Sequence, residues 1–141
     1  MDLTGKLAKL NGVNADTNFT HSDAVRLDFV ALGITAASAH QLFTIPAGRA
    51  ITKVTAVVLA AVTGGDVAVK MKVGSTETTL VTLDDADLVL NAVMQTNVND
   101  IAAYSPSDVI TIEVTPAATI TAGDIVLIID SVPVKEFITN G

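Results

Sequence analysis

The chain has 141 residues, a mass of 14.5 kDa and a net charge of -7, and half of its residues are hydrophobic. This length suits one domain with a hydrophobic core. Eight Lys and Arg against 15 Asp and Glu argue against binding to nucleic acid or anionic lipid, because both need basic side chains. The absence of Cys excludes disulfides, thiolate metal sites and Cys nucleophiles.

The N-terminal segment carries one apolar stripe. Leu3, Leu7 and Leu10 follow a spacing that places them on one helix face. So short a helix is not stable alone in water, so the segment is either a frayed leader or an arm that becomes ordered on a partner. Residues 1–10 lack the apolar stretch of a secretion signal, and no run in the chain reaches the length of a membrane span. We therefore expect a soluble protein made in the cytoplasm, with no membrane partner.

From Ala24 onward the sequence is typical of short β-strands separated by Gly, Pro, Asp and Asn. Apolar residues take every second position in residues 67–73 and 110–114, which predicts antiparallel strands with one buried and one solvated face. The glycines of Thr63–Asp66 predict a tight hairpin turn. The expected strands are residues 24–30, 41–45, 51–62, 66–73, 77–83, 109–115 and 124–132.

Residues 84–96 fit two structures. Asp84, Asp85 and Asp87 suit the start of a helix, whereas Leu88–Leu90 suits a strand equally well. The three acids do not form a calcium loop, since position 6 counted from Asp85 is Leu90 rather than Gly and no closing Glu follows. They are expected to be solvated residues that cap a helix or a turn.

The chemistry-bearing residues do not form a catalytic pattern. His21–Asp23 contains the residue types of a catalytic triad, but a real triad is assembled from separate elements. His40 is expected at a loop edge, and no glycine-rich segment has the frame of a phosphate-binding loop. We therefore expect a protein that is not an enzyme, with no catalytic residue, no metal and no cofactor.

Seven or eight short strands with frequent turns predict an all-β protein, either an antiparallel β-sandwich or a jelly-roll-like barrel with a short N-terminal arm. The predicted organisation is an N-terminal arm at 1–23, a β-sandwich domain at 24–132 and a C-terminal tail at 133–141.

Two of the expected strands contain stretches, residues 56–62 and 125–129, in which the residues on both faces of the strand are apolar. One parity fills the core, and the other needs cover from the chain's own arm or loops, or from a subunit interface. A closed oligomer is the usual solution. We expect the interface to use the arm stripe and one parity of these strands: Leu3, Leu7, Leu10, Val57, Val58, Leu59, Val126, Leu127 and Ile128.

A family resemblance rests on residues 43–48 (Phe-Thr-Ile-Pro-Ala-Gly), 51–54 (Ile-Thr-Lys-Val), the Gly64–Gly65 hairpin, Tyr104 before residues 110–114, and Thr121–Gly123 before the last strand. Over residues 41–132 this pattern resembles small structural proteins of tailed bacteriophages. The resemblance implies a virion component that is made in the cytoplasm of a bacterial host, is commonly trimeric and has no catalytic residues.

Three functions follow as hypotheses. The first is a capsid decoration, or cement, protein that binds the major capsid protein on the surface of the assembled head and stabilises the shell. The second is a head-fibre base or a tail-associated module of the virion. The third is a carbohydrate-binding module, which needs a cluster of exposed aromatic side chains. Against the third, the aromatic residues are few and scattered: Phe19, Phe29, Phe43, Tyr104 and Phe137.

Overall fold

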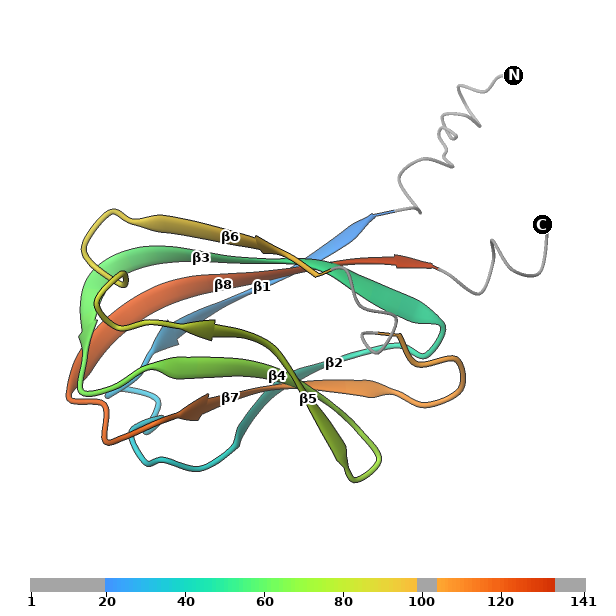
Figure 1. Ribbon diagram of the computed structural model, residues 1–141, viewed down its shortest axis with the longest axis horizontal. Coiled ribbons are helices and arrows are strands. Elements are labelled where there is room, and N and C mark those ends of the chain that lie inside the picture. The colour runs from blue at the N-terminus through green and yellow to red at the C-terminus, as the bar shows by residue number, and fades with distance from the viewer. Residues whose placement is uncertain (1–19, 99–103, 134–141) are drawn as a thin grey trace, which may run out of the picture.

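The computed structural model describes residues 20–98 and 104–133, which form eight β-strands (Figure 1). The predicted all-β class is confirmed. The strands are β1 (His21–Asp28), β2 (His40–Ile45), β3 (Arg49–Thr63), β4 (Val67–Val73), β5 (Thr76–Leu83), β6 (Val93–Asn97), β7 (Ile110–Pro116) and β8 (Ala122–Pro133).

The strands form two four-stranded sheets that pack face to face. The first sheet has the order β1-β8-β3-β6 and the second has the order β2-β7-β4-β5. Every strand pair is antiparallel, and the chain passes repeatedly from one sheet to the other (Figure 1). Eight strands connected in this way form a jelly roll, which confirms the predicted sandwich.

The core lies between the sheets and is built by the period-2 alternation of the strands. Val67, Val69 and Met71 of β4 are at most 2% exposed, and every second residue of β7 from Ile110 to Val114 is fully buried. β3 and β8 supply the facing layer from the first sheet, with buried residues Val54, Ala56, Val58, Ile125, Leu127 and Ile129. An aliphatic core of this kind follows directly from the apolar, aromatic-poor composition.

The stretch whose structure the sequence left open forms turns followed by a strand. Residues 85–87 and 90–91 are turns, and β6 occupies residues 93–97. Asn91 takes the left-handed conformation with φ of 70°, which Asn tolerates better than most residues. Backbone hydrogen bonds from Val58 N to Ala92 O (2.9 Å) and from Asn91 N to Val58 O (3.0 Å) hold this segment against β3. Pairing with β3 therefore selects the strand over the helix.

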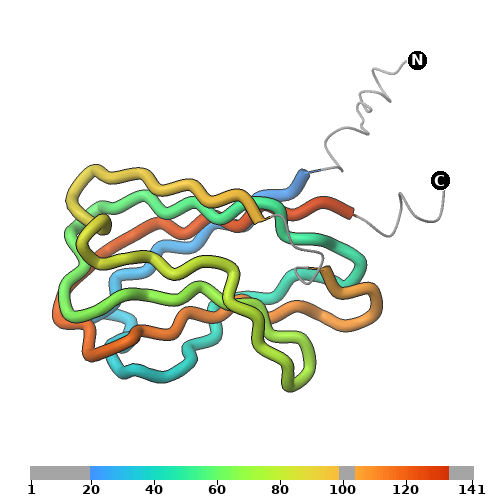
Figure 2. The backbone as a smooth tube through the Cα atoms, in the orientation of Figure 1, coloured from blue at the N-terminus to red at the C-terminus, as the bar shows by residue number. Residues whose placement is uncertain are grey.

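Four connections meet at one end of the sandwich: residues 29–39, 64–66, 84–92 and 117–121 (Figure 2). Phe29, Ile34, Leu88 and Ile120 in these loops are at most 6% exposed and close the core at this end. Ile120 N donates to Thr35 O (2.9 Å) and Asp85 N donates to an Asp66 carboxylate oxygen (2.9 Å). We call this the loop end; β1 begins and β8 ends at the opposite end.

Of the predicted arm, domain and tail, the structure describes most of the domain and only a few residues beyond its two borders. β1 begins at His21, which pairs with Ser131, so residues 21–23 belong to the first sheet. The Leu3, Leu7 and Leu10 stripe and residues 134–141 lie outside the described residues. Among residues 20–98 and 104–133, no helix is long and apolar enough to cross a membrane.

Candidate interaction surface

Alternate residues of β3 and β8 lie on opposite faces of the first sheet. Val58 and Leu127 point into the core and are at most 1% exposed. Val57, Val126 and Ile128 are half-buried on the opposite, outward face of the first sheet, and Leu59 is 43% exposed there. Of the six strand residues expected at an interface, four therefore share the outward face and two belong to the core.

Cross-strand pairing joins the outward residues into one surface. Val57 is the register partner of Val126 on β8 and of Val93 on β6, and Ile128 is the partner of Thr55 in the next outward row. Val93 is 61% exposed, while Thr55, in the middle of the face, is only 7% exposed. We call Val57, Leu59, Val93, Val126 and Ile128 the aliphatic band.

Two ion pairs border the aliphatic band. On one side Arg26 of β1 donates a hydrogen bond from Nε to Asp124 of β8 (3.1 Å), and this contact lowers the pKa of the Asp124 carboxyl. On the other side Lys53 Nζ lies 3.6 Å from Asp130 Oδ2. Ser22 also donates a hydrogen bond to Asp130 (2.6 Å). Asp28 of β1 is the register partner of Asp124 and lies on this face as well, so two cations and three carboxylates surround its apolar centre.

The loop end also exposes aliphatic side chains, at Val30, Leu32, Val89 and Leu90, but its charge is of one sign. Its four connections contain Asp66, Asp84, Asp85 and Asp87 and no Lys, Arg or His. Asp66 Oδ1 accepts from Asp85 N and Asp84 Oδ1 accepts from Ala86 N, both at 2.9 Å, so these acids cap turns as expected. Carboxylate oxygens of Asp66, Asp84 and Asp85 lie within 4.8 Å of one another. Asp66 lies 18 residues before Asp84 along the chain, so no local sequence pattern joins it to this cluster.

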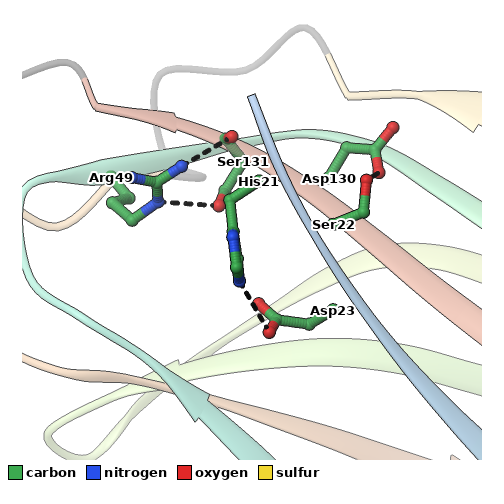
Figure 3. Close-up of polar contacts among 6 residues, drawn as sticks. All are labelled: His21, Ser22, Asp23, Arg49, Asp130 and Ser131. Atoms are coloured by element: carbon green, nitrogen blue, oxygen red, sulfur yellow. Dashed lines mark hydrogen bonds and ion pairs between the residues drawn. The ribbon is translucent and has the colours of Figure 1, made fainter. Parts of the chain in front are cut away.

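The triad residue types at the start of β1 do not form a relay (Figure 3). His21 Nε2 lies 3.1 Å from Asp23 Oδ1, because residues two apart share a face of the strand. Ser22 lies on the other face, where its hydroxyl donates to Asp130. The hydroxyl that would be the nucleophile therefore points away from the imidazole, as the sequence argument anticipated.

Two hollows lie beside β1 and β2, the edge strands on one side of the sandwich, and another of about 440 Å³ lies between the β4–β5 turn and residues 104–108. One groove of about 560 Å³ has mainly aliphatic walls and is lined by Val25, Leu27, Leu32, Ile34, Ala39, His40, Gln41 and Leu42. A smaller hollow of about 200 Å³ lies next to His21 and Arg49. Arg49 is held by hydrogen bonds to the hydroxyl and the backbone oxygen of Ser131, both 2.9 Å (Figure 3).

The outward face of the second sheet is polar, with one buried acid in its middle. Glu113 of β7 is 1% exposed, and its Oε1 atom has no hydrogen-bond partner. Burial raises the pKa of Glu113, and a hydrogen bond and charge repulsion from Glu77 raise it further, while Lys72 and Lys70 lower it. Threonines surround this acid on β5 and β7, so this sheet face carries no aliphatic band.

Sequence reasoning missed one member of the band. Val93 is its most exposed residue, but it lies in the stretch whose secondary structure was left open. The alternation Val93, Gln95, Asn97, exposed at every second position, was the available signal. It is too short to fix a strand without the pairing to β3.

No protein-family model matches this sequence, and no curated protein matches it significantly. Solved structures do match. A chain in the acidic stable capsid structure of Helicobacter pylori bacteriophage KHP30 superimposes with a TM-score of 0.53 at 16% identity, covering 82% of this chain and 89% of that one. A chain in the capsid of Ralstonia phage GP4 gives 0.52 at 17% identity, covering 90% and 94%.

The jelly roll is therefore a fold that occurs in phage capsids. The coverage is high in both directions, so the match extends over the whole sandwich rather than over one hairpin. Identities of 16% and 17% establish the likeness of the fold, and function has to be argued from this chain's own surfaces.

Proposed function

We propose that this protein is a non-enzymatic structural component of a phage virion, and specifically a capsid decoration protein that binds the assembled head. The observation that carries the proposal is the fold shared over at least 82% of this chain with chains of two phage capsid structures. The sequence resemblance to small tailed-phage structural proteins supports the same class independently of the coordinates.

The surfaces of the described residues suit a binding protein better than an enzyme. The outward face of the first sheet carries a contiguous aliphatic band, whereas the contact between His21 and Asp23 lacks a converging hydroxyl. A decoration protein acts without chemistry, by bridging neighbouring copies of the major capsid protein. Because it binds the assembled shell and not free subunits, it stabilises the shell by mass action.

The partners in this proposal are the major capsid protein and further copies of this chain, with a trimer as the state that the resemblance favours. The net charge of -7 keeps the protein away from packaged nucleic acid. A head-fibre base or tail-associated module would use the same fold. The number of copies per particle distinguishes them, because a decoration protein follows the capsid lattice and a fibre base is present in few copies.

The function is tested with purified protein and undecorated heads. We expect saturable binding to the shells and a higher temperature of shell disruption when the protein is bound. Particle imaging should place the bound protein at lattice sites. Failure to bind shells, or density confined to the tail or to a few fibre sites, would contradict the decoration role.

The N-terminal stripe gives a second prediction about the same binding. Replacing Leu3, Leu7 and Leu10 together with alanine is expected to weaken binding to shells without changing the melting temperature of the sandwich. The reason is that the partner surface must offset about 1–2 kcal/mol of backbone entropy per ordered residue, which requires apolar burial. The matched control replaces Lys6 and Lys9, which lie off the stripe. Equal binding by the leucine variant and the wild type would refute the attachment role.

A further inference from the structure

We infer that the outward face of the first sheet is a self-association surface, at which the aliphatic band packs against the band of a second copy of this chain. This inference deepens the proposed function by naming the occupant of one surface. It rests on the composition of the face, its charge balance, its size and the location of the chain's excess acid.

The apolar side chains of the aliphatic band are neighbours across the strands. Val126, Val57 and Val93 form one row across β8, β3 and β6, with Ile128 in the neighbouring row of β8. Val93 is 61% exposed and Leu59 is 43% exposed, so the band is open to solvent in the single chain. Contiguous aliphatic patches of this kind mark interaction sites in folded proteins.

The charge of the outward face also favours a second copy of this chain. Two copies of a chain with net charge -7 repel each other at most orientations. At the band, however, Arg26 pairs with Asp124 and Lys53 pairs with Asp130, and Asp28 beside Arg26 is the remaining acid, so the face carries a net charge of about -1 against the -7 of the whole chain. The two ion pairs are satisfied within each copy, so repulsion between two such faces is small.

Much of the chain's excess acid lies at the loop end, away from the band. The loop end also exposes Val30, Leu32, Val89 and Leu90, but its connections hold four carboxylates and no basic side chain, so charge repulsion opposes association of two copies through that end. The outward face of the second sheet carries threonines, lysines and Glu113 instead of a band. A second copy is therefore expected to bind at the outward face of the first sheet.

The area of the face is also sufficient. The four strands of the first sheet have 8, 12, 15 and 5 residues, 40 in all. At about 3.3 Å per residue and about 4.8 Å per strand, the face has a flat area on the order of 630 Å². This is close to the area of about 800 Å² that each partner buries in a stable interface, so the face is large enough for a second copy.

The test compares two exposed valines in the full-length protein. Val93→Asp places a charge in the band, and Val109→Asp places the same charge at a valine that is 53% exposed just before β7, outside the band. By light scattering at micromolar concentration the wild type is expected to have two or three times the mass of 14.5 kDa. Val93→Asp is expected to raise the dissociation constant by about 10–100-fold, and Val109→Asp to leave it unchanged.

A wild-type mass of 14.5 kDa would overturn the inference and leave the chain's own N-terminal segment as the cover of the band. An oligomer that Val109→Asp dissociates and Val93→Asp does not would overturn it too, because the interface would then lie elsewhere. Melting curves of both variants control for folding, and Val93→Thr provides a milder second variant. Shell binding by a monomer would refute self-association alone, whereas an oligomer that ignores shells would refute the decoration role alone.

Discussion

Gly64→Ala is expected to destabilise the folded protein by about 3–5 kcal/mol, an unusually large loss for the addition of one methyl group. Gly64 lies in the turn between β3 and β4 with φ of +120°. A Cβ atom there would lie 2.1 Å from the backbone oxygen of Thr119 and 2.9 Å from Cα of Ile120. Both obstacles are main-chain atoms, so no side-chain rotation relieves the overlap.

The surrounding loop cannot move away cheaply. Ala117 N donates to Asp66 O and Thr121 N donates to Thr63 O, each at 2.9 Å, so the loop between β7 and β8 is hydrogen-bonded to both sides of the turn. Ile120 is 1% exposed and fills the end of the core. Relieving the clash would break these bonds or open a cavity, and domains of this kind have only about 5–15 kcal/mol of stability.

Gly74→Ala is the matched control for this prediction. Gly74 also has positive φ, +62°, in the turn between β4 and β5, but nothing lies within 4 Å of an added Cβ atom. It is expected to cost only the left-handed strain of about 1–2 kcal/mol. Urea denaturation of both variants measures the difference. Equal losses at the two positions would show that backbone strain, and not the close approach of the loop, sets the requirement for glycine at position 64.

Glu113→Gln is expected to stabilise the protein at neutral pH by about 1–3 kcal/mol, because it removes the desolvation cost of a buried charge while keeping the size of the side chain. Glu113 is the register partner of Lys70 on β4 and of Gln41 on β2, and its carboxyl is covered by these neighbouring strands. Lys70 is itself engaged with Glu77, at 3.8 Å. Lys72 and Lys70 lower the pKa of Glu113, but burial has the larger effect and raises this pKa above the ordinary value of 4.5.

The raised pKa fixes the direction of the pH dependence. Between pH 4.5 and the raised pKa, the folded protein binds a proton at Glu113 that the unfolded chain has released. The contribution of this group to the free energy of unfolding therefore falls as pH rises through that window and is largest on the acid side. Gln keeps the shape of the protonated acid without the charge. The free energy of unfolding of the variant should therefore lack this pH-dependent decrease.

The measurement is the difference in free energy of unfolding between wild type and Glu113→Gln from pH 4 to pH 8. The difference should grow with pH. Glu77→Gln removes the charge repulsion from Glu77 but not the burial of Glu113, so it should reduce the effect without abolishing it. If Glu113→Gln instead destabilised the protein at neutral pH, the ionised carboxyl would be a net stabilising partner of Lys70 and Lys72.

The sequence was sufficient to predict the class of the fold and most of its strands. Alternation of apolar and polar residues has a period of two within a single strand, so the buried face of β4 and β7 can be predicted without knowing their neighbours. The turn glycines could be predicted in the same way, since positive φ at Gly48 and Gly64 is a local requirement. That Ser22 and His21 do not form a relay also followed locally, because adjacent residues of a strand point in opposite directions.

Only the tertiary structure decided which outward residues meet. His21 pairs with Ser131, so the first and last strands are neighbours although 110 residues separate them, and no local pattern encodes such a pair. β3 and β8 are apolar at both parities, so a shift of one residue would exchange their faces, and only packing against the second sheet selects Val58 and Leu127 for the core. The burial of Glu113 on a polar face and the position of Val93 beside Val57 also follow from which strands pair with each other. Side-chain surroundings in a sheet are set by non-local strand pairing, whereas the sequence pattern determines only each strand's own alternation.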